Sequence, residues 1–149
     1  MNSKVKFTVA RISITLLFFI VTMLQFLSFP GQISHMRDKN SWSLVFEISL
    51  LILVVSWMLA AQIALINIWK ITSHMKRETF FSASCISLID NVLKCFAGAI
   101  AIAIAMFALL APQADDPGFF VLLTAVTLFI STLYILVRLL RDQLVQKVQ

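Results

Sequence analysis

The sequence predicts an all-α integral membrane protein, a four-helix bundle with both its N- and C-termini in the cytoplasm. Hydrophobic residues make up 60% of its 149 residues and charged residues only 13%, whereas soluble domains are about 45–50% apolar. Four apolar stretches are each long enough to cross the hydrocarbon layer, which takes roughly 20 helical residues. The basic residues gather in the segments on one side of the predicted membrane. A single membrane domain over residues 1–149 leaves no room for a separate soluble catalytic module.

The first predicted span covers about residues 7–29, and only Arg11 near its start interrupts the apolar run. A long arginine side chain at such a position can reach the lipid headgroups. Pro30 and Gly31 then end the helix. A cleaved signal peptide is the alternative, because basic residues precede this stretch. Its apolar part is longer than a signal-peptide core, however, and no A-x-A cleavage site follows.

The second predicted span covers about residues 43–69. Trp42 precedes it and Trp69 ends it, and the amphipathic indole ring favours the membrane–water interface. Glu47 lies in the first turns of this helix, near the outer surface. An ionisable group within a membrane helix is a candidate for function, so Glu47 is the first candidate functional residue. The alternative is an interfacial carboxylate that reaches the headgroups.

Two amide side chains, Gln62 and Asn67, lie in the last turns of the same span. Amides in lipid form hydrogen bonds between neighbouring helices. Both are therefore candidate residues that we expect to bind across helices, and a substrate site is the alternative.

The third span begins before it enters the membrane. From Phe81 onward apolar residues recur at helical spacing, which predicts one long helix over about residues 82–110. Its first turns, about residues 81–92, are expected to lie amphipathically on the cytoplasmic surface, while about residues 93–111 cross the membrane. Phe81 is expected either to anchor this segment in lipid or to form a docking edge for a cytoplasmic protein.

Polar and small residues of the third helix suggest further contacts. Asp90 and Lys94 are four residues apart, so they are expected to pair on the helix surface. Ala97, Ala101 and Ala105 follow along one ridge, and small residues let helices approach closely in lipid. This ridge is predicted either to pack against the fourth span or to form a homodimer.

The fourth predicted span covers about residues 119–137, followed by a brief polar tail. A short connection joins it to the third, so the two spans must form an antiparallel hairpin. The connection contains Asp115, Asp116, Pro117 and Gly118, which are typical of a tight turn on the outer surface. Two adjacent carboxylates offer too few oxygens for a calcium site, which requires six or more.

The distribution of Lys and Arg predicts the orientation, because cytoplasmic loops retain basic residues. Of the 12 Lys and Arg residues, only Arg37 and Lys39 lie on the side opposite to the other ten. Both termini and the middle loop are therefore expected in the cytoplasm. Residues 30–42 and 112–118 are expected to face outward.

Two segments resemble a bacterial four-span membrane family known as domain-of-unknown-function family 2975. ETFFSASCISLIDNVLKC at residues 78–95 is similar to its amphipathic helix entry, and ADDPGFF at residues 114–120 is similar to its Asp-Asp-Pro-Gly turn. The distinctive part covers residues 70–141, and the four-span pattern extends the resemblance over nearly the whole chain. It implies a multi-pass protein of the bacterial plasma (inner) membrane. Members are often encoded beside small helix-turn-helix regulators, which implies a cytoplasmic partner of that type.

The predicted function is that of a non-enzymatic membrane module with a regulatory, sensing or partner-binding role. Cys85 and Cys95 fit no CxxC or metal-ligand spacing, so we expect free thiols. The spans lack the paired acids or Ser/His of an intramembrane protease. We therefore expect no enzymatic activity, cofactor, metal or direct nucleic-acid binding. The alternative is a small dimeric transporter or an accessory subunit of a transporter, for which Glu47 is the residue to test.

Overall fold

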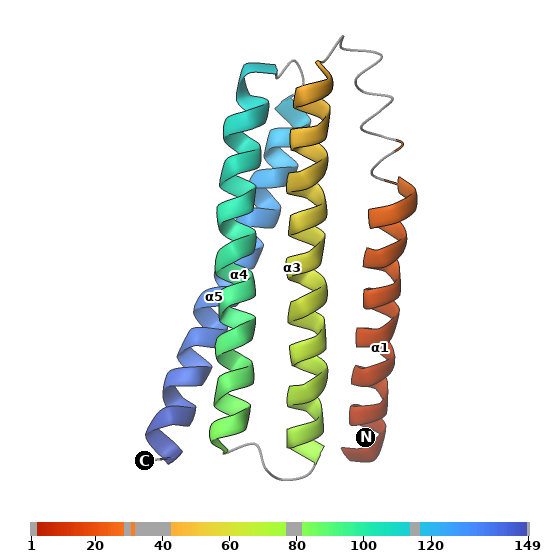
Figure 1. Ribbon diagram of the computed structural model, residues 1–149. Helices are drawn as coiled ribbons and strands as arrows, with labels where there is room; N and C mark the ends of the chain where they lie inside the picture. Colours follow the sequence, from red (N-terminus) through yellow and green to blue (C-terminus); the bar gives the residue numbers. More distant parts are fainter. Residues whose placement is uncertain (1–2, 29–30, 32–42, 77–81, 114–116, 149) are drawn as a thin grey trace.

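The computed structural model describes residues 3–28, 31, 43–76, 82–113 and 117–148. No strand occurs among these residues, and four long helices account for nearly all of them (Figure 1). The elements are α1 (Ser3–Met23), the short π-helix η1 (Leu24–Ser28), α3 (Leu44–Lys76), α4 (Ala83–Leu110), the 3₁₀ turn η2 (Ala111–Gln113) and α5 (Pro117–Val148). The predicted all-α class and four-helix architecture are confirmed.

Successive helices run in opposite directions, so the N- and C-termini lie at the same end of the bundle (Figure 1). We call this the terminal end: α1 and α4 begin there, and α3 and α5 end there. The opposite end is the far end. Within the described part of the chain, α4 contacts both α3 and α5, whereas α1 contacts α3 alone among the other long helices. α3 and α4 are therefore the two inner helices of the bundle, and α1 and α5 are the two outer ones.

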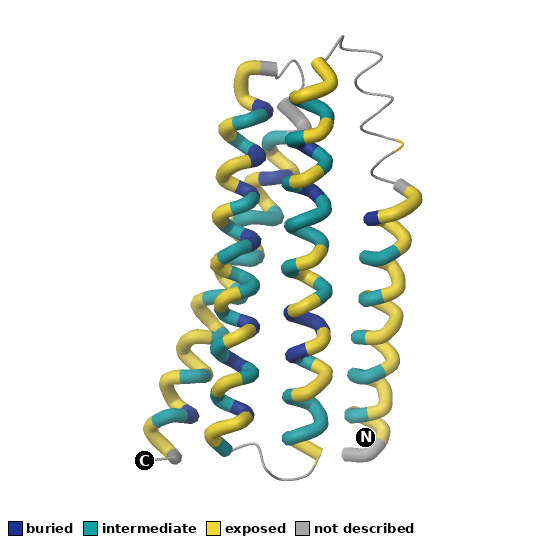
Figure 2. The backbone as a smooth tube through the Cα atoms, in the orientation of Figure 1, coloured by how far each residue is buried: buried dark blue, intermediate teal, exposed yellow. Residues whose placement is uncertain are grey.

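All four helices are long and apolar enough to cross a membrane. The candidate spans are Val5–Leu27, Leu44–Lys76, Ala83–Leu110 and Phe120–Lys147. Large apolar side chains are exposed on them, and Figure 2 shows exposed residues along the outer face of each helix. Such extensive apolar surface suits lipid, because soluble proteins rarely expose apolar patches of this extent to water.

α3 and α5 are longer than a membrane crossing requires. At 1.5 Å per residue, the 33 residues of α3 extend about 50 Å, against a hydrocarbon layer of ~30 Å. The sequence predicted a second span ending at residue 69 and a fourth ending at residue 137 before a polar tail. The helices instead continue to Lys76 and Val148. Neither segment contains Pro or Gly after its first turn, and a helix does not end merely because it reaches the membrane surface.

α4 is one uninterrupted helix, in agreement with the helix predicted over residues 82–110. Ser82 is its N-cap, with φ −109° and ψ 151°, and Ser82 Oγ accepts a hydrogen bond of 3.3 Å from the backbone N–H of Cys85. Such a cap satisfies one of the N–H groups that the first helical turn leaves unpaired. The cap places the start of α4 at the terminal end, just before its amphipathic turns.

One face of each of α3, α4 and α5 forms the core of the bundle. Its buried side chains are Leu50, Val54, Ala103, Met106, Leu110 and Leu123. Phe107 of α4 and Phe120 of α5 pack beside it, with ring centroids 5.7 Å apart. These contacts join the predicted antiparallel hairpin of α4 and α5 to α3.

The predicted packing of Ala97, Ala101 and Ala105 against the fourth span is wrong, because all three side chains are exposed. Ala99 and Ala103 are buried instead, at 7% and 0% exposure. This face is offset by two residues, a rotation of about 200° around a helix with 3.6 residues per turn. Both faces carry alanine, and hydropathy does not choose between them because lipid and protein interior are equally apolar. Homodimerisation through the exposed ridge stays a prediction.

Candidate functional site at the terminal end

Arg11 of α1 contacts α3 through two different interactions. Its Nη2 donates a hydrogen bond of 2.8 Å to Ser73 Oγ, and its guanidinium carbon lies 5.0 Å from the centroid of the Trp69 ring. Ser73 Oγ in turn donates to the carbonyl oxygen of Trp69 at 3.2 Å. A cation over an indole face is attracted by the negative potential of the ring. Arg11, which was expected to reach toward the lipid headgroups, therefore links α1 to α3.

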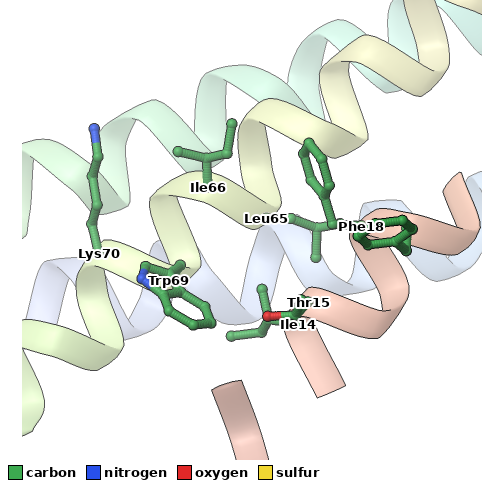
Figure 3. A pocket seen from close by; sticks show the side chains of 8 residues that line it. Ile14, Thr15, Phe18, Leu65, Ile66, Trp69 and Lys70 are labelled. Carbon is green, nitrogen blue, oxygen red and sulfur yellow. The ribbon is translucent and has the colours of Figure 1, made fainter. Parts of the chain in front are cut away.

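A groove beside this link separates α1 from α3. One hollow of about 320 Å³ extends over apolar side chains from both helices and another of about 490 Å³ adjoins Arg11, and the two share Thr15, Phe19 and Trp69. In Figure 3, Trp69 and Leu65 of α3 project toward Ile14 and Thr15 of α1, whereas the amino group of Lys70 points away from them. The lining of the groove is therefore mostly apolar, and Arg11 and Lys70 are the two cations among the described residues that line it.

An ion pair joins α4 to α5 at the terminal end. Arg141 Nε donates to Asp90 Oδ1 at 2.9 Å, and Arg141 Nη1 lies 3.3 Å from Asp142 Oδ1. The side chains of Arg141 and Asp90 are each 36% exposed. The predicted pair of Asp90 with Lys94 is wrong: in the described structure Asp90 binds Arg141 instead. The fourth helix continues far enough to bring a guanidinium beside Asp90, and that group donates with a fixed planar geometry that Lys lacks.

A small hydrophobic cluster packs at the same end as this ion pair. Cys85, Ile89 and Leu144 are buried together, and Ile71 of α3 is among the side chains packed against them. The turns of α3, α4 and α5 around this cluster carry charged residues such as Lys70, Lys94 and Arg138. The three helices thus remain packed together up to the terminal end. We call these joined turns the terminal extension; they comprise residues 70–76, 83–94 and 138–148.

The two amides of α3 behave differently. Gln62 Nε2 donates to Thr22 Oγ1 of α1 at 3.0 Å, so the predicted hydrogen bond across helices is confirmed. Asn67 is buried at 7% exposure, but its Nδ2 donates to the carbonyl oxygen of Ile63 in its own helix at 2.8 Å. The expected cross-helix bond of Asn67 is therefore wrong. The carbonyl four residues earlier is always within reach of a short side chain, and a bond to it requires no partner helix.

Gln25 was not singled out from the sequence. It lies in η1, is buried at 7% exposure, and its Oε1 has no hydrogen-bond partner among the described residues. The sequence signal that could have identified Gln25 is its amide side chain within an otherwise apolar run. The π-helical turn that contains Gln25 could not be predicted, because a π-helical turn leaves no sign in the hydropathy pattern of an apolar helix.

The remaining predicted site residues are dispersed. Glu47 lies half-buried in the first turn of α3, at the far end. Phe81, Asp115 and Asp116 lie outside the described residues. Pro117 and Gly118, assigned to a turn, are the first residues of α5, and proline suits that position because the first helical N–H has no partner within the helix.

Cys85 is buried, Cys95 is half-buried, and both are free cysteines. The described residues contain no group of three or more His, Cys, Asp or Glu side chains that could hold a metal ion. The features of the terminal end are therefore the contacts that hold its helices together, its positively charged side chains and the groove between α1 and α3.

Four membrane-crossing helices with exposed apolar flanks define a multi-pass membrane protein. A family model described as "Protein of unknown function (DUF2975)" matches residues 7–148. The chain belongs to this family, as the helix entry at 78–95 and the turn at 114–120 predicted. Neither the curated proteins nor the solved structures include a match to the chain.

Proposed function

We propose that the chain is a non-enzymatic module of the bacterial plasma membrane whose terminal extension binds a cytoplasmic partner in a regulatory or sensing role. The observation that carries this proposal is the joining of α3, α4 and α5 beyond the length needed for crossing. The Asp90–Arg141 ion pair and the cluster around Cys85 hold these turns together. A helix end that only connects a span to a loop needs no such contacts. Helix ends held together by these contacts form a surface that suits the binding of a partner protein.

The polar face of α4 supports partner binding. Ser84, Ser87, Asn91 and Lys94 are all exposed. Their spacing of three and four residues places them on one side of the helix. Arg138 of α5, which also lies in the terminal extension, is exposed and adds a second positive charge. Such a face suits a soluble protein with an acidic patch, and the helix-turn-helix regulator implied by the family resemblance is the partner class to test.

The positions of the acidic residues favour this role over transport. A coupled cation transporter requires a carboxylate near the middle of the membrane. Among the described residues, the acidic ones are Glu47 at the far end of α3, Asp90 in the terminal extension, and Asp142 near the end of α5. The side chain of Gln62 donates a hydrogen bond to Thr22 of α1, which favours a role in helix packing over one in a substrate site.

The test is photo-crosslinking in native membranes with the reactive residue at Asn91, on the polar face of α4. The matched control carries it at Leu122, which is exposed on α5 toward the far end. We expect one soluble protein to be captured from Asn91 and from Phe81, and not from Leu122. Asp90→Arg should reduce the yield and the charge-swapped Asp90→Arg/Arg141→Asp variant should restore it. Capture of lipid alone, or of a second copy of the chain, would contradict the proposal.

Glu47 provides a separate test against the transporter alternative. On the proposed role, Glu47→Gln leaves the crosslink at Asn91 unchanged and alters no uptake or resistance phenotype. A coupled transporter would lose such a phenotype in this variant, because the amide cannot exchange a proton or bind a cation as the carboxylate does.

A further inference from the structure

Arg11 is a cation within a membrane span and has no carboxylate partner among the residues that the structure describes. Its one hydrogen bond among the described residues goes to the neutral Ser73 Oγ. The ion pairs that Arg141 forms with Asp90 and Asp142 do not include Arg11. Its Nε is enclosed without a hydrogen-bond partner. A guanidinium has five N–H donors, so much of its donor capacity is unused, and a charge at this depth is costly unless an anion accompanies it.

The depth of Arg11 is that of the lipid headgroup boundary. The candidate span of the first helix begins at Val5, and at 1.5 Å per residue Arg11 lies roughly 9 Å along the helix from that point. The flexible arginine side chain adds several ångströms of reach toward the interface. Trp69 lies beside it, and indole rings favour the same boundary. A phosphate at the membrane surface is therefore a nearby source of the anion that the described residues do not supply.

The groove continues from Arg11 along α1, between side chains that are mostly apolar. The hollow of about 490 Å³ contains Arg11, and the adjoining hollow of about 320 Å³ is lined by Phe18, Leu65 and Ile66 (Figure 3). A polar headgroup site that leads directly into an apolar groove matches the two chemical parts of a phospholipid. A soluble anion would leave the apolar part empty.

We infer that the groove between α1 and α3 binds an anionic phospholipid, with its phosphate at the Arg11 guanidinium and an acyl chain along Phe18 and Leu65. A guanidinium recognises phosphate by parallel N–H donors. An anionic lipid is favoured over a zwitterionic one, because the zwitterionic headgroup carries its own cation and leaves the charge of Arg11 less compensated. The bound lipid would fill the space between the outer helix α1 and the rest of the bundle.

The test is native mass spectrometry of the delipidated full-length protein, titrated with phosphatidylglycerol or with phosphatidylcholine of the same acyl chains. We expect one phosphatidylglycerol to bind about fivefold more tightly than phosphatidylcholine, the factor for one basic residue near a membrane surface. Arg11→Gln should abolish this preference. Lys6→Gln is the matched control, because Lys6 is exposed on the same helix and does not line the groove; it should retain the preference.

Two further variants keep the inference testable if Arg11→Gln fails to fold. Arg11→Lys retains the charge and should retain the preference for the anionic lipid. Thr15→Phe fills the part of the groove that both hollows share and should weaken binding of both lipids. Equal binding of the two lipids to the wild-type protein would overturn the inference. The inference would also be overturned if Lys6→Gln and Arg11→Gln lost the preference for phosphatidylglycerol equally. The same holds if a photo-crosslinker at Thr15 captured a second copy of the chain.

Discussion

At the scale of single residues, the polar side chains Gln62, Asn67 and Arg11 of the spans bind three different kinds of partner. Gln62 is long enough to reach Thr22 on the neighbouring helix, whereas the shorter Asn67 binds the carbonyl oxygen of Ile63 in its own helix. Arg11 pairs with no acid among the described residues and binds a hydroxyl group and an aromatic face. In lipid no water competes for these groups, so side-chain length and position decide the partner.

The Gln62–Thr22 hydrogen bond should stabilise the packing of α1 on α3. A double-mutant cycle with Gln62→Leu and Thr22→Val should give a coupling of about 0.6–1 kcal/mol, the usual range for such bonds in membranes. The measurement is reversible unfolding in mixed micelles. A cycle of Asn67→Leu with Thr22→Val is the control and should show additive effects. Additive effects in the Gln62 cycle itself would mean that the bond does not contribute.

At the scale of elements, α4 decides how the bundle is joined. Its face at Ala99 and Ala103 is buried, the face at Ala97 and Ala101 is exposed, and its first turns carry Asp90 toward α5. One helix therefore provides the core, a lipid-facing surface and the ion pair of the terminal extension. This arrangement depends on the rotation of α4 about its axis.

The same substitution on the two faces of α4 should have different effects. Ala103→Leu places a large side chain where Ala103 is 0% exposed, so overpacking should lower the free energy of unfolding by about 1–3 kcal/mol. Ala105→Leu lies on the exposed face and should change it by no more than about 0.5 kcal/mol. Unfolding in mixed micelles measures both. If Ala105→Leu were the more destabilising of the two, the exposed ridge would be a packing interface, as between two copies of the chain.

At the scale of the whole molecule, the bundle has two ends of different character. The terminal end has both termini, the Asp90–Arg141 pair and the groove beside Arg11, while the far end has Glu47. α1 contacts α3 alone among the long helices of the described structure. The described part of the bundle therefore consists of α3, α4 and α5 around a shared core, with α1 packed on α3.

This asymmetry predicts one orientation in the membrane. Because basic residues are retained in the cytoplasm, a green fluorescent protein fused after Gln149 should fluoresce. Alkaline phosphatase inserted after Asp116 should be active, since that position is expected to face outward. The reverse pattern of the two reporters would place the terminal extension outside and remove the basis for a cytoplasmic partner.

An all-α membrane protein with four helices is predicted from the sequence alone, because apolar length and the spacing of Lys and Arg are local properties that lipid acts on directly. The sequence also determined the family, and it identified Gln62 as a residue that links helices. Only the tertiary structure decided which face of α4 packs, that Asp90 binds Arg141, and that Arg11 lies over Trp69 beside a groove. The physical reason is that lipid and protein interior are equally apolar, so hydropathy leaves the rotation of each helix undetermined. Contacts between distant segments settle that rotation.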